Sequence, residues 1–262
     1  MKPAASPVRA GGWRVPVGVG RRQGGQSAIE YLIVFPMLIM LLFGVIQWSL
    51  IYQARAVVNH ATLLAARAGA LHNGNARQMR NAFGAGIAPL FATEPSDAKY
   101  VEAVAKGTLD AHYPNILTLK VVNPTENAFR DFERPKLNGN GGTEIPNDTL
   151  QYRSTTVGTQ SQVSIQDANV LHLRTTYCYR MYVPVVNNVI STVANALWSF
   201  DDSLQAHGMS DPFGIGGDEG DFEVPWNDTC NFFTTKREPR IKITSEAVVR
   251  MQSPYFRENY PP

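Results

Sequence analysis

A lone carboxylate stands directly before the longest apolar stretch of this 262-residue chain. Glu30 is followed by Tyr31, and no charged residue occurs between Tyr31 and Ala54. A carboxylate costs about 2.5–3.5 kcal/mol at the centre of a bilayer and less near its edge. A glutamate in a first helical turn also complements the helix macrodipole. An explanation by the macrodipole alone does not account for Gly25 and the basic cluster before it. Gly25 and Glu30 are therefore both candidate functional residues.

The uncharged stretch after Glu30 is long enough to cross a membrane as a single helix. It would span about 36 Å, against about 30 Å of bilayer hydrocarbon. Trp48 and Tyr52 lie at its far end, where amphipathic rings favour the interface. Residues 1–25 hold five basic and no acidic side chains, whereas only Arg55 closely follows the stretch. The positive-inside rule therefore places the N-terminus in the cytoplasm and the rest of the chain outside.

Two other accounts of this stretch fit less well. A cleaved secretory signal has a shorter apolar region and a small-residue cleavage pattern, which does not follow Ser49 here. A helix in a large soluble core can be apolar all round, but an uncharged run of this length is a poor match for one.

The junction before the stretch resembles a known family. Residues 25–31 read Gly-Gln-Ser-Ala-Ile-Glu-Tyr, which is similar to the cleavage region of type IV prepilins. The Glu-Tyr form resembles the TadE-like pseudopilins of tight-adherence (Tad/Flp) pilus systems. The resemblance is strongest over residues 20–72, and less specific similar blocks occur at 117–132, 171–186 and 241–256. The main Tad pilins are very short, so a chain of this length would be a minor or accessory subunit.

This resemblance implies roles for four residues. A prepilin peptidase would cut after Gly25, whose missing side chain lets the backbone enter a narrow site, and Gln26 would become the N-terminus. Glu30 and Tyr31 would then be the fifth and sixth residues of the mature chain. Glu30, paired with the Gln26 ammonium of a neighbouring subunit, would neutralise both charges in an apolar fibre core and fix the axial register.

The same resemblance implies partners and a location. The partners are the prepilin peptidase, other pilin and pseudopilin subunits, and the inner-membrane pilus assembly platform. The chain would be a single-pass protein of the bacterial inner membrane with its C-terminal part in the periplasm, which leaves incorporation into a surface pilus open.

Helical periodicity continues beyond the uncharged stretch. Asn73-Gly74 is a stop signal, so we expect one helix from about Ser27 to His72. Pro36 removes a backbone donor and predicts a kink, which would make the segment bendable or is simply tolerated. Small and apolar residues recur every three or four positions on one helix face: Ala54, Val57, Val58, Ala61, Leu64, Ala65, Ala68 and Leu71.

The remaining pattern predicts an α+β fold. Residues 76–110 read as helical, with breaks at Pro89 and Pro95 and a cap at Ser96. The strand signals are Ile116–Val122, Val170–Val183, and Arg240–Thr244 paired with Ala247–Met251. Val185–Leu204 reads as a further helix, and Asn138–Asp148 and Ser210–Asp228 read as loops.

These elements give three expected parts: a cytoplasmic leader at 1–25, a transmembrane and protruding helix at 26–72, and a periplasmic α+β domain at 73–262. Cys178 and Cys230 are the two cysteines of the chain, and export favours a disulfide between them over two buried thiols. Such a bond would tie the long intervening segment to the sheet.

Sites for catalysis and cofactors are not predicted. The five histidines lack metal-ligand spacing, and no nucleotide or hydrolase motif occurs. The acidic stretch 218–223 lacks the spacing of an EF-hand, so a solvated loop is favoured over a calcium site. Basic residues do not cluster outside the leader, which argues against nucleic acid. The alternatives to a pseudopilin are an uncleaved membrane-anchored binding or adhesive protein and, less favoured, a signal-anchored enzyme.

Overall fold

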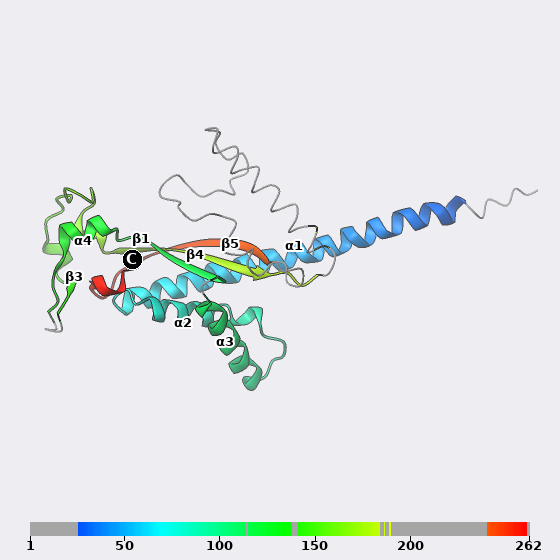
Figure 1. The fold of residues 1–262 in the computed structure, drawn as a ribbon, viewed down its shortest axis with the longest axis horizontal. Coiled ribbons are helices and arrows are strands. Elements are labelled where there is room, and N and C mark those ends of the chain that lie inside the picture. The colour runs from blue at the N-terminus through cyan, green and yellow to red at the C-terminus, as the bar shows by residue number, and fades with distance from the viewer. Residues whose placement is uncertain are drawn as a thin grey trace, which may run out of the picture. The chain divides into compact units, whose positions relative to one another are not determined.

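The computed structural model describes residues 26–113, 115–137, 141–183 and 240–260, together with Val186 and Val189. The chain divides into two compact units, Met1–Leu42 and Phe43–Pro262. Helix α1, Gln26–Leu71, begins in the first unit and continues into the second. The other helices and two antiparallel sheets complete an α+β arrangement, which confirms the predicted fold class (Figure 1).

One face of the C-terminal half of α1 is buried in the second unit. The buried residues are Ala54, Val58, Ala61, Thr62, Ala65, Ala66 and Ala70. Their spacing of three and four confirms the amphipathic pattern. The buried face differs from the predicted one at its edges. Leu71 was predicted to be buried but is 55% exposed, whereas Thr62, Ala66 and Ala70 are buried although the pattern did not include them. Small side chains dominate this face, so the helix backbone lies close to the elements that cover it.

The end of α1 confirms the predicted stop. The helix ends at Leu71, and Asn73 and Gly74 both adopt left-handed backbone conformations, with φ of 57° and 75°. Gly74 N–H donates to Gly69 O across 2.9 Å, which satisfies a carbonyl of the last turn. A Cβ on Gly74 would lie 2.3 Å from the Tyr255 ring, so this turn needs glycine for space as well as for conformation.

The larger sheet has the strand order β1-β4-β5, with β1 at Leu117–Asn123, β4 at Val170–Arg180 and β5 at Arg240–Arg250. All its pairs are antiparallel. The prediction that Arg240–Thr244 pairs with Ala247–Met251 is wrong, because β5 is one continuous strand paired along its whole length with β4. The predicted break at Ser245-Glu246 lies inside β5, where these residues pair with Thr175 and Arg174. Glu246 is exposed, and a polar residue on the solvent face does not end a strand.

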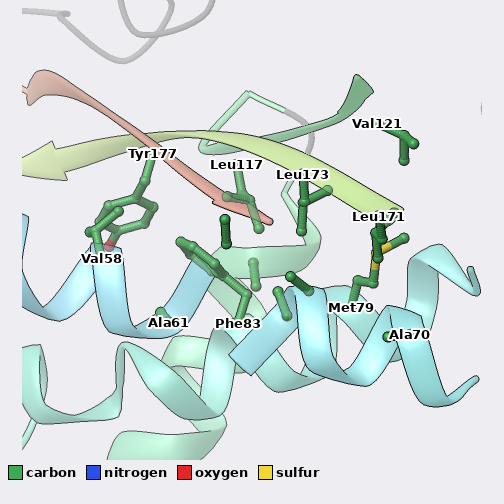
Figure 2. Close-up of a cluster of buried hydrophobic side chains, with 14 of the residues drawn as sticks. Val58, Ala61, Ala70, Met79, Phe83, Leu117, Val121, Leu171, Leu173 and Tyr177 are labelled. Carbon is green, nitrogen blue, oxygen red and sulfur yellow. The ribbon is translucent and has the colours of Figure 1, made fainter. Parts of the chain in front are cut away.

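The inward face of this sheet packs on α1 and on α2, Ala76–Gly86. Figure 2 shows strand residues pointing toward residues of the two helices: Leu117, Leu171, Leu173 and Tyr177 from the strands, and Val58, Ala61, Met79 and Phe83 from the helices. Each large side chain buried in such a layer contributes about 1.5–3 kcal/mol. This layer therefore contributes several kcal/mol-scale burials to the stability of the second unit.

The predicted helical region 76–110 forms α2, a short 3-10 turn at Ala88–Leu90 and α3 at Asp97–His112. Asn75 caps α2 by accepting from the backbone N–H groups of Arg77 and Gln78. Ser96 is at the expected N-cap position of α3 but makes no side-chain capping hydrogen bond. The Arg80 guanidinium of α2 donates to Ala111 O at the end of α3.

A second, smaller sheet has the order β2-β3-β6, with β2 at Arg134–Pro135, β3 at Thr143–Ile145 and β6 at Tyr255–Phe256. It corrects the prediction that Asn138–Asp148 is entirely loop. The glycines in this region indicated a loop, and a strand of three residues is too short to show the alternation that would have predicted it. Two short helices lie near it in the chain, α4 at Glu126–Phe132 and α5 at Ile165–Ala168.

A buried hydroxyl pair joins α1 to the middle of the larger sheet. Thr62 Oγ1 lies 2.6 Å from Thr175 Oγ1 and donates to Val58 O across 2.8 Å. We expect Thr62→Val to lower the free energy of unfolding by about 1–2 kcal/mol, because the Thr175 hydroxyl keeps only a longer contact to Ser245 O. The measurement is the thermal midpoint of the full-length chain in detergent.

The pair of substitutions Thr62→Val and Thr175→Val supplies the control for this prediction. The double variant should lose less than the sum of the two single losses, because no unpaired hydroxyl is left. Strictly additive losses would contradict a direct bond between the two side chains.

Candidate functional site

The first unit presents an apolar surface on every side of α1. The side chains of residues 30–42 are exposed, with Ile39 half-buried, and from Tyr31 onward none carries a charge. Large apolar side chains that surround a helix without a polar face have no stable place in water. Among the described residues, α1 is the one helix long and apolar enough to cross a membrane. The predicted membrane segment is therefore present as a helix that could span a bilayer.

The predicted assembly residues lie at the start of this helix. Gly25 lies outside the described residues, and Gln26 is the first residue of α1. Glu30 is exposed, one turn further along. Tyr31 is exposed and stacks on Phe35, with ring centroids 5.2 Å apart. Pro36 lies inside the helix, and the kink expected there stays a prediction.

A buried glutamine marks the point at which α1 becomes covered by the rest of the second unit. Gln47 has no exposed surface, and its Oε1 accepts a 3.0 Å hydrogen bond from the backbone N–H of Val183. Val183 follows β4 by three residues, so this bond connects the end of β4 to the apolar helix. The sequence gives one signal for it: Gln47 is the first amide side chain in the uncharged stretch, and Gln53 near the end of the stretch is the other. A polar group within apolar surroundings needs a partner.

A helix face that lies about 80–140° around the axis from Gln47 carries two aromatic residues and then a cation. Trp48, Tyr52 and Arg55 are all exposed, and their spacing of four and three places them on one side of α1. Amphipathic rings followed by a basic residue are typical of a membrane–water boundary. The boundary predicted near Trp48 and Tyr52 therefore coincides with the level at which β4 reaches the helix.

The outer face of the larger sheet carries charged side chains in register. Lys120, Arg174 and Glu246 form one cross-strand row. Glu246 contacts His172 Nε2 at 2.8 Å and also accepts from Arg174 Nε. Burial alone would raise the pKa of Glu246, but the hydrogen bonds to His172 and Arg174 hold that pKa below its usual value. These contacts order the sheet surface and bring no nucleophile and base together.

The predicted disulfide involves this same face. Cys178 lies in β4 opposite Lys242 of β5 and is disulfide-bonded. Cys230 lies outside the described residues, as do the acidic stretch 218–223 and almost all of the helix expected at Val185–Leu204. Within the described part of the chain, no cluster of three or more His, Cys, Asp or Glu side chains could hold a metal ion.

Comparison with known protein families gives a match to the N-terminal part of the chain. Residues 25–67 match the family model described as TadE-like protein. The matched segment starts at the predicted cleavage glycine and ends within the buried part of α1. No curated protein and no solved structure matches significantly. The N-terminal segment is thus TadE-like, which indicates a component associated with a Tad pilus.

Proposed function

We propose, from the TadE-like match over residues 25–67, that this chain is a minor pseudopilin of a Tad pilus or a related secretion apparatus. The observation that carries the proposal is the sequence position of Gly25 directly before α1 and of Glu30 directly before the part of α1 that is apolar on all sides. A helix of this kind is stable in a bilayer and also in a fibre core made of similar helices. The role is structural, with no reaction catalysed by the chain.

The three expected parts have separate tasks in this proposal. The basic leader, residues 1–25, stays in the cytoplasm until a prepilin peptidase removes it. The helix at 26–72 holds the subunit in the inner membrane and later among other pilin and pseudopilin subunits. The domain at 73–262 lies in the periplasm, where a disulfide between Cys178 and Cys230 is chemically stable. The inner-membrane assembly platform is the partner that would extract the subunit.

Glu30 acts after cleavage in this proposal. The new ammonium group of Gln26 and the Glu30 carboxylate are both costly in an apolar core unless they are paired. Pairing between neighbouring subunits neutralises both charges and sets the axial position of one helix against the next, as a single buried polar pair does in coiled coils. Tyr31 would lie beside this pair.

Mass spectrometry of the chain purified from cells with an active prepilin peptidase tests the proposal. The expected N-terminus is Gln26, in the membrane fraction or in sheared pili. A chain that keeps residues 1–25 in such cells would instead support an uncleaved membrane-anchored binding or adhesive protein.

Substitution of Glu30 separates assembly from processing. We expect Glu30→Gln and Glu30→Ala to leave cleavage after Gly25 largely intact and to lower incorporation into the assembled apparatus at least tenfold, because both remove the carboxylate. Incorporation is measured by immunoblot of the sheared or crosslinked assembly. The matched control is Glu94→Ala, which removes an exposed carboxylate from the second unit. Normal incorporation of the Glu30→Gln chain would remove the proposed charge pair.

A further inference from the structure

The end of β4 reaches α1 at the outer end of the uncharged stretch. Val183 N–H donates to Gln47 Oε1, and the neighbouring side chains of Met181 and Val186 are buried. Gln47 precedes Arg55, the first charge after the stretch, by eight residues. Eight helical residues correspond to about 12 Å along the axis. The contact therefore lies at the depth at which a membrane-spanning helix passes from hydrocarbon into the headgroup layer.

Aromatic and cationic side chains of two segments lie close in sequence to this contact. Trp48, Tyr52 and Arg55 face outward from α1. Tyr182, directly after Met181, is 53% exposed, and the Arg180 guanidinium lies 5.8 Å from the centre of its ring. We name these five residues the interfacial collar. They come from segments more than 120 residues apart in the chain, and the Gln47–Val183 bond keeps the two segments at one level.

The chemistry of the collar matches the surface of a bilayer. Tyrosine and tryptophan rings prefer the headgroup region, where one edge of the ring is apolar and the other is hydrated. Arginine side chains reach from this depth to lipid phosphates, to which a guanidinium binds through paired hydrogen bonds. The helix continues from the collar toward the N-terminus without a charge up to Glu30, so the collar borders an apolar segment on one side only.

We propose that the interfacial collar binds phospholipid headgroups of the outer leaflet of the inner membrane, with a preference for anionic lipids. The inference rests on the proposed membrane topology. It adds that the folded domain makes its own lipid contact through Arg180 and Tyr182. This contact holds the domain at one level above the membrane before the subunit enters an assembly, and extraction from the bilayer must break it.

Site-specific photo-crosslinking of the full-length chain in lipid nanodiscs tests the proposal. The nanodiscs hold equal parts of phosphatidylglycerol and phosphatidylcholine. Benzoylphenylalanine replaces Tyr182, and in separate samples it replaces Tyr152, which is 80% exposed in a short 3-10 turn, or Leu38, which is exposed in the apolar part of α1. We expect lipid crosslinks at Tyr182 at least tenfold above those at Tyr152, and acyl-chain crosslinks at Leu38.

The outcomes distinguish this inference from the proposed topology. Acyl-chain crosslinks at Leu38 with no more lipid at Tyr182 than at Tyr152 would overturn the collar while the membrane span stands. No lipid crosslink at Leu38 would overturn the membrane span, and the collar with it.

The anionic preference has a separate measurement. With benzoylphenylalanine at Tyr52, Arg55→Gln should lower the ratio of phosphatidylglycerol to phosphatidylcholine crosslinks about fivefold, roughly the contribution of one interfacial cation. The matched control is Arg67→Gln, an exposed arginine of the same helix that lies about 18 Å further along the axis. An unchanged ratio in the Arg55→Gln chain, or an equal fall in the Arg67→Gln chain, would contradict the anionic preference.

Discussion

Gly25→Leu is expected to leave the chain with its basic leader attached, even in cells with an active prepilin peptidase. A peptidase that cuts at a membrane surface must hold the backbone on both sides of the scissile bond. Glycine admits that close approach because it has no side chain, whereas leucine adds four carbon atoms at the same place. Cleavage should fall at least a hundredfold, measured by intact mass and by the mobility of the membrane-bound chain.

The leader offers a matched control for this substitution. Gly20→Leu introduces the same side chain five residues before the expected cut, within the same basic region. It should be processed normally if the peptidase recognises Gly25 itself. Gly25→Ala adds a single methyl group and should be cut slowly. Equal processing of the Gly25→Leu and Gly20→Leu chains would show that the scissile bond lies elsewhere.

An uncleaved chain would also test the proposed role of Glu30. Without a free ammonium on Gln26, the carboxylate of a neighbouring subunit has no partner of opposite charge in the apolar core. The Gly25→Leu chain should therefore remain in the membrane, folded and with its disulfide, and be absent from the assembly. Loss of assembly with a normal domain would separate a processing defect from misfolding.

The long helix was predictable from the sequence because its signals are local. An uncharged run, a period of three to four residues and the Asn73-Gly74 stop each depend on neighbours in the chain. They predict a helix from about Ser27 to His72, and the observed helix, Gln26–Leu71, agrees to within one residue at each end. The family resemblance at residues 25–31 depends on the same local pattern, and the family match over residues 25–67 agrees with it.

The long-range contacts were not predictable in the same way. Nothing in the residues around Gln47 indicates that Val183 will donate to it, because the contact depends on where β4 ends in space. The pairing of Thr62 with Thr175 also needs the sheet register. Periodicity assigned Leu71 to the buried face, but the helix ends there and the chain turns away, which leaves that side chain exposed. Sequence patterns identify a face, and packing decides its edges.

Close packing of α2 against α3 is a further feature that periodicity misses, since it depends on two glycines. A Cβ built on Gly107 would lie 2.3 Å from Gly84 O, and one built on Gly84 would lie 2.5 Å from Thr108 Cα. The obstacles are backbone atoms, which cannot turn aside as a flexible side chain can. The two helices, which lie beside each other in Figure 1, therefore meet backbone to backbone at this point.

Gly107→Val should accordingly force α3 away from α2. Overpacking of this kind lowers the free energy of unfolding by about 1–3 kcal/mol. We expect a loss near the upper value at Gly107, because its neighbours are backbone atoms that cannot move aside easily. The thermal midpoint of the full-length chain in detergent should fall by about 6–10 °C. Hydrogen exchange should rise in α3 and at the end of α2 before it rises in the larger sheet, because the sheet packs on α1 independently of Gly107.

Ala105→Val is the matched control, since it places the same branched side chain on the exposed face of the same helix. Its expected change is within about 0.5 kcal/mol, the usual range for surface positions. Valine has a better helix propensity than glycine, so the intrinsic preference opposes the predicted loss at Gly107 and cannot produce it. Equal thermal midpoints for the two variants would mean that α3 can shift without cost, and that the glycine contact does not hold the helix in place.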